Sequence, residues 1–405
     1  MAEKFSVDTN ELAGLGAGTE DLAAYVGKVE AFVNAEAGPK DGWNGLMSQI
    51  KAPFEGMRTA TANRYNQRQT VMYMTGNELI SLANLYRDQE QRRSERIRQV
   101  SDTPVTAHDS FQQGDATTAA AHYTSDGQPD LTPAAHEEAD VVGIVREAAS
   151  WVADADDAIK WGTGWSPIND TFNKLVGNWA ELTRIGNAYS KAGEGIAGAG
   201  EDFQTMANRV KSHWDGDAAK GFDGWAPKLA KAFQAEKPLT KVVKDCLDLL
   251  VAEIKKLIKK IVELIKKKLE EHVQIKSWSG ALKALARRVP FAGNAYEAGE
   301  VIKMLYDVYN EAQKLVEEVQ KAVDLVKSVV DFFSNPVDFL KDAGEKKLKE
   351  KLDEAEKKAG GGGSDEFRQL KKDLPAAFGG AFDVAQTPGG AYSGGKDGHP
   401  WADAQ

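Results

Sequence analysis

The sequence contains a single cysteine, Cys246, which excludes a framework of intramolecular disulfide bonds. It also has no run of about 18 uncharged apolar residues, so we expect no conventional membrane span. Residues 1–16 lack the apolar core of a signal peptide. If the protein leaves the cell, it therefore needs a route that does not read a cleaved signal.

An excess of basic charge is missing as well. Acidic residues outnumber basic ones, 61 to 51, and the formal net charge is −10. A surface that binds phosphates needs clustered lysine and arginine, so this balance argues against a nucleic-acid partner. The hydrophobic share of 42% and the length of 405 residues are those of a folded soluble protein with two or three helical modules.

Patterns that carry enzyme chemistry are missing too. Residues 193–198 match a dinucleotide-loop pattern, but a helix rather than a strand is expected before them. The segment 136–138 (His-Glu-Glu) lacks the second histidine of a zinc-binding helix, and no Gly-x-Ser-x-Gly elbow is present. No base is placed to activate Cys246, which is more typical of a packed thiol. We predict no enzyme, and no catalytic, cofactor or metal residue.

Apolar residues recur at helical spacing along most of the chain and strand patterns are essentially absent, which predicts an all-α fold. Asp8 and Glu11 have the spacing of a capping box at the start of a helix. A break at 38–45 separates this helix from a longer one, so residues 1–100 form a helical hairpin. Thr132-Pro133 and Ser166-Pro167 are each typical of a helix start, because proline is tolerated in the first turn.

These two starts predict one helix to about residue 160 and another that runs to about residue 210. A further helix follows Trp214-Asp215-Gly216, and a lysine-rich helix covers 242–273. The expected organisation is an N-terminal hairpin, a flexible linker, a second hairpin bundle, long amphipathic antiparallel helices and a Gly-rich disordered tail, over residues 1–100, 101–133, 134–275, 276–359 and 360–405.

The most informative motif is Trp-x-Gly, which occurs twice between long amphipathic segments, at Trp43–Gly45 and Trp214–Gly216. Glycine permits the positive φ that a tight turn between two helices needs. Tryptophan closes the open end of a helix pair by burying a large apolar surface. A single occurrence is common at corners between helices, whereas two occurrences at hairpin centres are more specific.

The region around residues 170–235, with His213-Trp214-Asp215-Gly216 at its turn, resembles the actinobacterial WXG family of helical hairpins. Residues 5–12 resemble small proteins of the same fold that are associated with ESX secretion. The resemblance covers about two-thirds of the chain. It implies export by a type VII secretion system, and its partners would be a WXG-type partner hairpin or the secretion ATPase.

Members of this superfamily carry an export signal, Tyr-x-x-x-Asp/Glu, after the second helix of the hairpin. Tyr86 and Glu90 fit this pattern beyond Trp43, and Tyr296 and Glu300 fit it farther from their Trp-x-Gly. The resemblance therefore makes these four residues candidates for a secretion signal. The alternative is an ordinary i, i+4 pair on a helix surface.

The lysine-rich segment 242–273 supports two interpretations. As a core helix it would pack its apolar stripe on the helices after Pro290, with its lysines in solvent. As a basic amphipathic helix it would lie on an anionic membrane surface, giving a peripheral membrane contact. The first interpretation is favoured.

Three function hypotheses follow. The first is a substrate or secreted component of a type VII (ESX-like) secretion system that acts through helix–helix contacts, with possible self-association. Such a protein would be cytoplasmic before export and secreted or on the cell surface afterwards. The alternatives are a membrane-active helical protein and a non-exported coiled-coil scaffold or chaperone.

Overall fold

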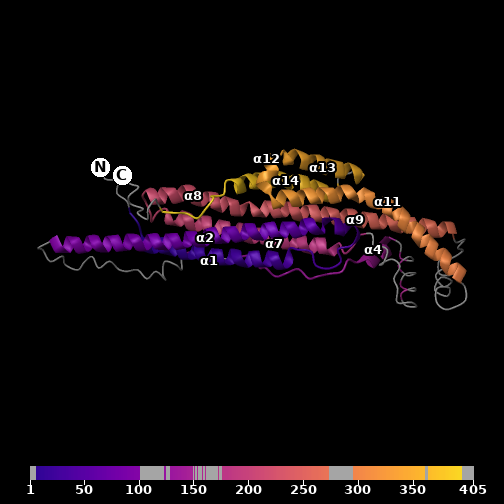
Figure 1. The fold of residues 1–405 in the computed structure, drawn as a ribbon, viewed down its shortest axis with the longest axis horizontal. Coiled ribbons are helices and arrows are strands. Elements are labelled where there is room, and N and C mark those ends of the chain that lie inside the picture. Colours follow the sequence, from indigo (N-terminus) through magenta and orange to yellow (C-terminus); the bar gives the residue numbers. More distant parts are fainter. Residues whose placement is uncertain are drawn as a thin grey trace.

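The protein is all-α in the computed structural model, which describes residues 6–100, 123–124, 128–148, 176–272, 295–360 and 364–394, with isolated positions between 150 and 172. Long helices run side by side in an elongated bundle (Figure 1). Within these ranges no β-strand is formed, and a single antiparallel bridge pairs Val7 with Trp214. The all-α prediction is confirmed.

The first two helices form the predicted N-terminal hairpin. Helix α1 (Thr9–Glu36) begins at Asp8, whose carboxylate accepts hydrogen bonds from the backbone N–H of Asn10 at 3.0 Å and of Glu11 at 3.3 Å. This satisfies N–H groups that have no partner within the helix. Helix α2 (Gly45–Val100) returns along α1, and the two pack along most of the length of α1.

A second pair of helices surrounds the second Trp-x-Gly motif. Helix α7 (Ala180–Val210) leads into the motif and α8 (Asp217–Gln234) leaves it. Helix α9 (Glu236–His272) continues almost directly from α8, because the intervening Ala235 keeps a helical backbone with φ −62° and ψ −21°. The predicted helix from residue 166 to about residue 210 is interrupted at residues 176–179, which are not helical and in which Gly177 has φ 89°. Its expected start at residue 166 lies outside the described residues.

The lysine-rich helix is α9, and its apolar stripe is buried as the favoured interpretation predicts. It packs on α7, on α11 (Ala295–Ser334) and on α14 (Asp365–Ala385). Two shorter helices, α12 (Pro336–Lys341) and α13 (Gly344–Lys358), connect α11 to α14. Helix α9 is therefore the helix around which α7, α11 and α14 pack.

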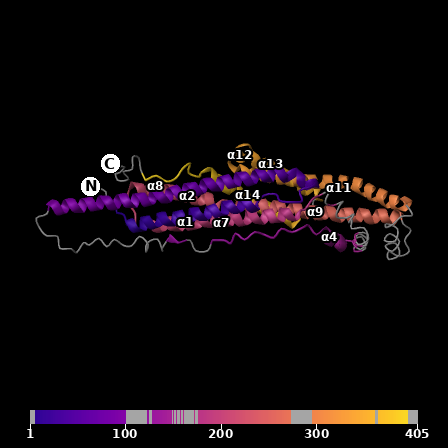
Figure 2. The same ribbon diagram turned by 60° about the horizontal axis from the view of Figure 1, so that its bottom comes forward.

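The prediction of a disordered tail from residue 360 is wrong over the whole of α14. Its buried residues recur at helical spacing on one face: Phe367, Leu370, Leu374, Ala377, Phe378 and Ala381. The free energy gained by burying this apolar face against α9 offsets the conformational entropy that the segment loses when it becomes helical. Residues 386–394 are not helical and continue from the end of α14 along the bundle toward α8 (Figures 1 and 2).

The predicted helix from Thr132 to about residue 160 is also wrong in its first part. Residues 128–140 are not helical, and helix α4 (Val141–Ala148) is the continuous helical stretch described in that region. The Asn178 amide holds the non-helical segment, since its Oδ1 accepts from the Ala139 N–H at 2.8 Å and its Nδ2 donates to the Glu137 carbonyl at 3.1 Å. Side-chain bonds of this kind replace helical ones.

One hydrophobic core joins residues from α1 to the segment after α14. The predicted segments 1–100, 134–275, 276–359 and 360–405 therefore all contribute to a common interior. The expected linker takes part as well, because Tyr123 is buried and its hydroxyl donates to the Glu11 carboxylate at 2.7 Å. Linker residues 101–122 and 125–127 lie outside the described residues.

Candidate functional site: the Trp214 turn

The first Trp-x-Gly motif forms the turn of the α1–α2 hairpin. Trp43 is buried and its ring lies 5.8 Å from that of Phe54. Gly45 has φ 52°, a backbone conformation that glycine adopts without steric cost. The Asn178 N–H donates to the Gly42 carbonyl at 2.8 Å, so the turn is fixed to the start of α7. These contacts give Trp43 and Gly45 a structural role at this corner.

The second motif lies at the other end of the bundle, where α7 turns into α8 (Figure 1). Trp214 is buried and Gly216 has φ 116°, which disfavours any residue with a Cβ. The N-terminal segment joins this turn through the bridge between Val7 and Trp214 and a 2.8 Å hydrogen bond from the Asp215 N–H to the Ser6 carbonyl. The second turn is therefore an assembly point for distant parts of the chain.

Tyr86, a predicted signal residue, is brought to this second turn. It is only 5% exposed. Burial raises the pKa of the Tyr86 hydroxyl, while the adjacent Trp214 indole acts in the opposite direction. Helix α2 carries Tyr86 roughly 60 Å from Gly45, at 1.5 Å per residue. Tyr86 thus belongs to the Trp214 turn and not to the Trp43 turn.

Glu90, four residues later, is exposed, as are all residues from 90 to 99. This end of α2 projects beyond the other helices that the structure describes (Figures 1 and 2). Its sequence is strongly charged and includes Ile97, which is 63% exposed. Tyr86 and Glu90 therefore mark the boundary between the packed part of α2 and a free helical end that is accessible to another protein.

The other predicted signal pair is less fully described. Tyr296 and Glu300 lie in the first turns of α11, where the backbone is helical. Their side chains lie outside the described residues.

Five aromatic rings surround the second turn, and we call them the aromatic cluster: Phe203, Trp214, Phe222, Trp225 and Tyr392. Tyr392 meets Phe222 edge-on, with ring centroids 5.1 Å apart and planes at 82°. It lies 6.2 Å from Trp214 and 6.0 Å from Trp225. Edge-to-face pairs of this kind each contribute about 0.5–1.5 kcal/mol beyond their burial.

The sequence analysis did not select Tyr392 or Trp225 as a site residue, although the helical spacing placed Trp225 on the apolar face of the helix after Trp214. Tyr392 stands in the run Pro388-Gly-Gly-Ala-Tyr-Ser-Gly-Gly, whose glycine content favours disorder. The signal that could have identified it is a lone aromatic residue in a segment without other large apolar groups. Trp225 lies three residues, about one helical turn, after Phe222, and this spacing places the two rings on one face of the helix that follows the second motif.

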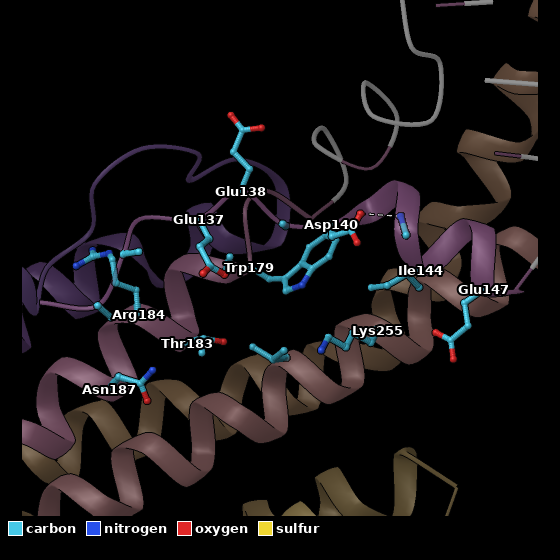
Figure 3. Close-up of a pocket in the computed structure, with 16 residues that line it drawn as sticks. Glu137, Glu138, Asp140, Ile144, Glu147, Trp179, Thr183, Arg184, Asn187 and Lys255 are labelled. Atoms are coloured by element: carbon cyan, nitrogen blue, oxygen red, sulfur yellow. Dashed lines mark hydrogen bonds between the residues drawn. The ribbon is translucent and has the colours of Figure 1, made fainter. Parts of the chain in front are cut away.

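A separate cavity of about 540 Å³ lies where residues 134–144 cover α7 and α9 (Figure 3). Carboxylates dominate its polar lining, from Glu137, Glu138, Asp140 and Glu147, with Lys255 on the opposite wall. The Asp140 carboxylate accepts a hydrogen bond from the Gly143 N–H at 2.7 Å, and so stabilises the start of α4. Across the described part of the chain, no group of three or more His, Cys, Asp or Glu side chains is arranged to hold a metal ion.

Two further findings bear on the sequence expectations. Cys246 is buried in α9, and burial raises the pKa of its thiol, which makes it inert as a nucleophile. Among the described residues, no helix combines the length and the apolar character that a membrane span requires.

Comparisons with known proteins add no relative. No family model, curated protein or solved structure matches this chain.

Proposed function

We propose that this chain is a substrate or secreted component of a type VII (ESX-like) secretion system, that it acts through helix–helix contacts, and that it is not an enzyme. It would be cytoplasmic before export and secreted or on the cell surface afterwards. A WXG-type partner hairpin or the secretion ATPase would dock on the free end of α2.

The observation that carries the proposal is the arrangement around Tyr86. The tyrosine is buried against a Trp-x-Gly turn, whereas Glu90 lies one helical turn further on in an exposed, projecting helix end. A signal needs a defined helical conformation and an accessible surface. The packed ring of Tyr86 stabilises the helix, and residues 90–99 provide the accessible surface.

The membrane-active alternative has less support. Its basis was the apolar stripe of the lysine-rich helix, and residues of that stripe such as Ile254, Ile258 and Ile261 are fully buried in α9. Contact with a membrane through this face would require the bundle to open. A non-exported scaffold thereby moves ahead of it to become the second candidate, favoured by the long helices that share one core.

The test is secretion of the full-length protein from an actinobacterial host with a type VII system, measured as the ratio of supernatant to cell-associated protein. Glu90→Ala should abolish export, because it removes an exposed carboxylate of the candidate signal. Glu95→Ala is the matched control, since Glu95 is exposed on the same projecting end. The free energy of unfolding of both variants should lie within about 0.5 kcal/mol of the wild-type value, as is usual for surface substitutions.

Tyr86→Ala alone would be ambiguous, because Tyr86 is buried and its truncation costs roughly 3 kcal/mol in packing. Tyr86→Phe keeps the ring and removes the hydroxyl, so it separates recognition from stability. Equal export of wild type, Glu90→Ala and Tyr86→Phe would contradict the assignment of the signal to this pair.

A further inference from the structure

The segment after α14, residues 386–394, lies across the Trp214 turn, and we call it the strap. Buried and exposed positions alternate over its last three residues: Tyr392 and Gly394 are buried, while Ser393 is exposed. Such alternation is that of an extended chain with one face on a surface. In Figure 2 the strap, in yellow, runs from α14 across the bundle toward the end where the Trp214 turn lies.

The strap is held mainly through its backbone. The Tyr392 N–H donates to the Thr75 hydroxyl at 3.1 Å, and the Gly394 N–H donates to the Glu78 carboxylate at 3.0 Å. On the opposite side, the Trp225 indole N–H donates to the Gly390 carbonyl at 3.3 Å. Any extended peptide can offer these backbone groups, so they provide affinity with little dependence on sequence.

A single side chain supplies the anchor. The Tyr392 ring enters the aromatic cluster, and its hydroxyl donates to the Ala218 carbonyl at 2.6 Å inside the first turn of α8. The carbonyl gives the buried hydroxyl a hydrogen-bond partner at the bottom of the site, and phenylalanine would fill the same space without that bond. The groove between α2 and α8 therefore discriminates in favour of tyrosine.

The neighbouring positions set further limits on what fits. A Cβ at Gly394 would lie 2.5 Å from Leu82 Cδ1, so glycine is favoured two residues after the tyrosine and a larger residue would have to push the Leu82 side chain aside. A Cβ at Gly389 or Gly390 would meet nothing within 4 Å, so these positions accept side chains. The groove therefore prefers peptides that carry the sequence Tyr-x-Gly in an extended conformation.

We propose that this groove is a peptide-binding site whose resident occupant is the strap, and that a partner polypeptide displaces the strap by inserting its own extended Tyr-x-Gly segment. The groove walls come from α2, α8 and the Trp214 turn, all of which belong to the common core without the strap. The strap itself buries two residues of its last four. It competes chiefly because it is tethered to α14, which gives it an effective concentration in the millimolar range. This inference is independent of export.

The test uses the full-length chain and a fluorescent peptide with the sequence of residues 386–394. Tyr392→Ala removes the anchor of the resident strap, so this variant should bind the peptide saturably in fluorescence anisotropy. Wild type should bind it at least about tenfold more weakly, because its own strap competes at high effective concentration. Tyr73→Ala is the matched control, since Tyr73 is an exposed tyrosine on α2, and it should behave as wild type.

Two altered peptides test the specificity. A peptide with alanine in place of Tyr392, and one with leucine in place of Gly394, should both fail to bind the Tyr392→Ala chain. If the Tyr392→Ala protein loses its helical circular dichroism signal, the full-length Gly394→Leu variant is used for the titration instead. Its leucine side chain would clash with Leu82 and so displace the strap. A folded strap variant that does not bind the peptide, or that binds all three peptides alike, would overturn the proposal.

Discussion

Glu236 lies in a buried charge cluster, and its replacement gives a quantitative test of the fold. The carboxylate is fully buried and accepts hydrogen bonds from Arg64 Nε at 2.9 Å and from the Tyr65 hydroxyl at 3.1 Å. Arg68 Nη1 lies 2.7 Å from the same carboxylate. Two buried guanidinium groups therefore depend on one carboxylate, and the cluster connects α2 to the start of α9.

Glu236→Ala should destabilise the protein by about 3–5 kcal/mol, because it leaves two buried positive charges without a counter-ion. Arg68→Met should lower the free energy of unfolding by much less, about 1 kcal/mol or below, because it leaves the balanced pair of Arg64 and Glu236. Burial also lowers the pKa of Arg68, which means that its charged form is already disfavoured in the folded protein. Glu263→Ala, at an exposed position of α9, should change stability by less than about 0.5 kcal/mol.

The assay is urea unfolding followed by circular dichroism, with the free energy of unfolding extrapolated to water. Burial raises the pKa of Glu236, but the charges of Arg64 and Arg68 outweigh it, so the pKa in the folded state is below the ordinary value of 4.5. Its stabilisation should then be complete above pH 4.5 and be lost as pH falls below it. If Glu236→Ala costs no more than Arg68→Met, the charge balance described here is wrong.

Two other predictions concern packing and pH. Burial and the neighbouring Asp373 carboxylate raise the pKa of Asp245 to about 6, so ionisation of this group lowers the free energy of unfolding as pH rises from about 4 to 6. Asp245→Asn should therefore raise the free energy of unfolding at pH 7 by about 1–2 kcal/mol and change it little at pH 4. Urea titrations at both pH values measure this difference. Gly200→Ala should cost about 1–3 kcal/mol, because its Cβ would lie 2.6 Å from Phe233 Cβ, whereas Gly224→Ala, with open space around it, should stabilise α8 by about 0.5–1 kcal/mol. Equal unfolding midpoints for the two glycine variants would contradict the close packing of α7 on α8.

The helices that the sequence predicted well are those with a long apolar repeat. In α9 the spacing of Leu250, Ile254, Leu257 and Ile261 leaves one apolar face, and a face of that length must be buried wherever the helix packs. The α1–α2 hairpin was equally accessible, because Asp8 caps one helix and Trp43–Gly45 marks the turn. Local chemistry decides these features.

The errors fall where distant contacts decide. Residues 132–140 begin with a typical helix start at Thr132-Pro133 and contain helix-forming residues, yet the Asn178 side chain, far along the chain, holds them in a non-helical conformation. Helix α14 was missed because glycines before and after it suggested disorder, although Phe367, Leu370, Leu374 and Phe378 already carried a helical repeat. Composition outweighed periodicity in that interpretation, and periodicity was the better guide.

The candidate site shows the same division. The motif residues Tyr86, Trp214 and Gly216 could be selected from the sequence, each by its own pattern. That Tyr86 meets Trp214, and not Trp43, depends on the length of α2 and on the packing of α7 against α1. No local pattern contains that information, and the same holds for the placement of Tyr392.

The central claim is export through a type VII system, and the most direct measurement is the fate of the unmodified full-length protein in two strains of one host, with and without the type VII secretion ATPase. A cytoplasmic marker protein controls for lysis. The account predicts full-length protein in the supernatant of the first strain and retention inside the cells of the second. Retention in both strains, or equal release from both, would contradict it and would make the scaffold function the leading candidate.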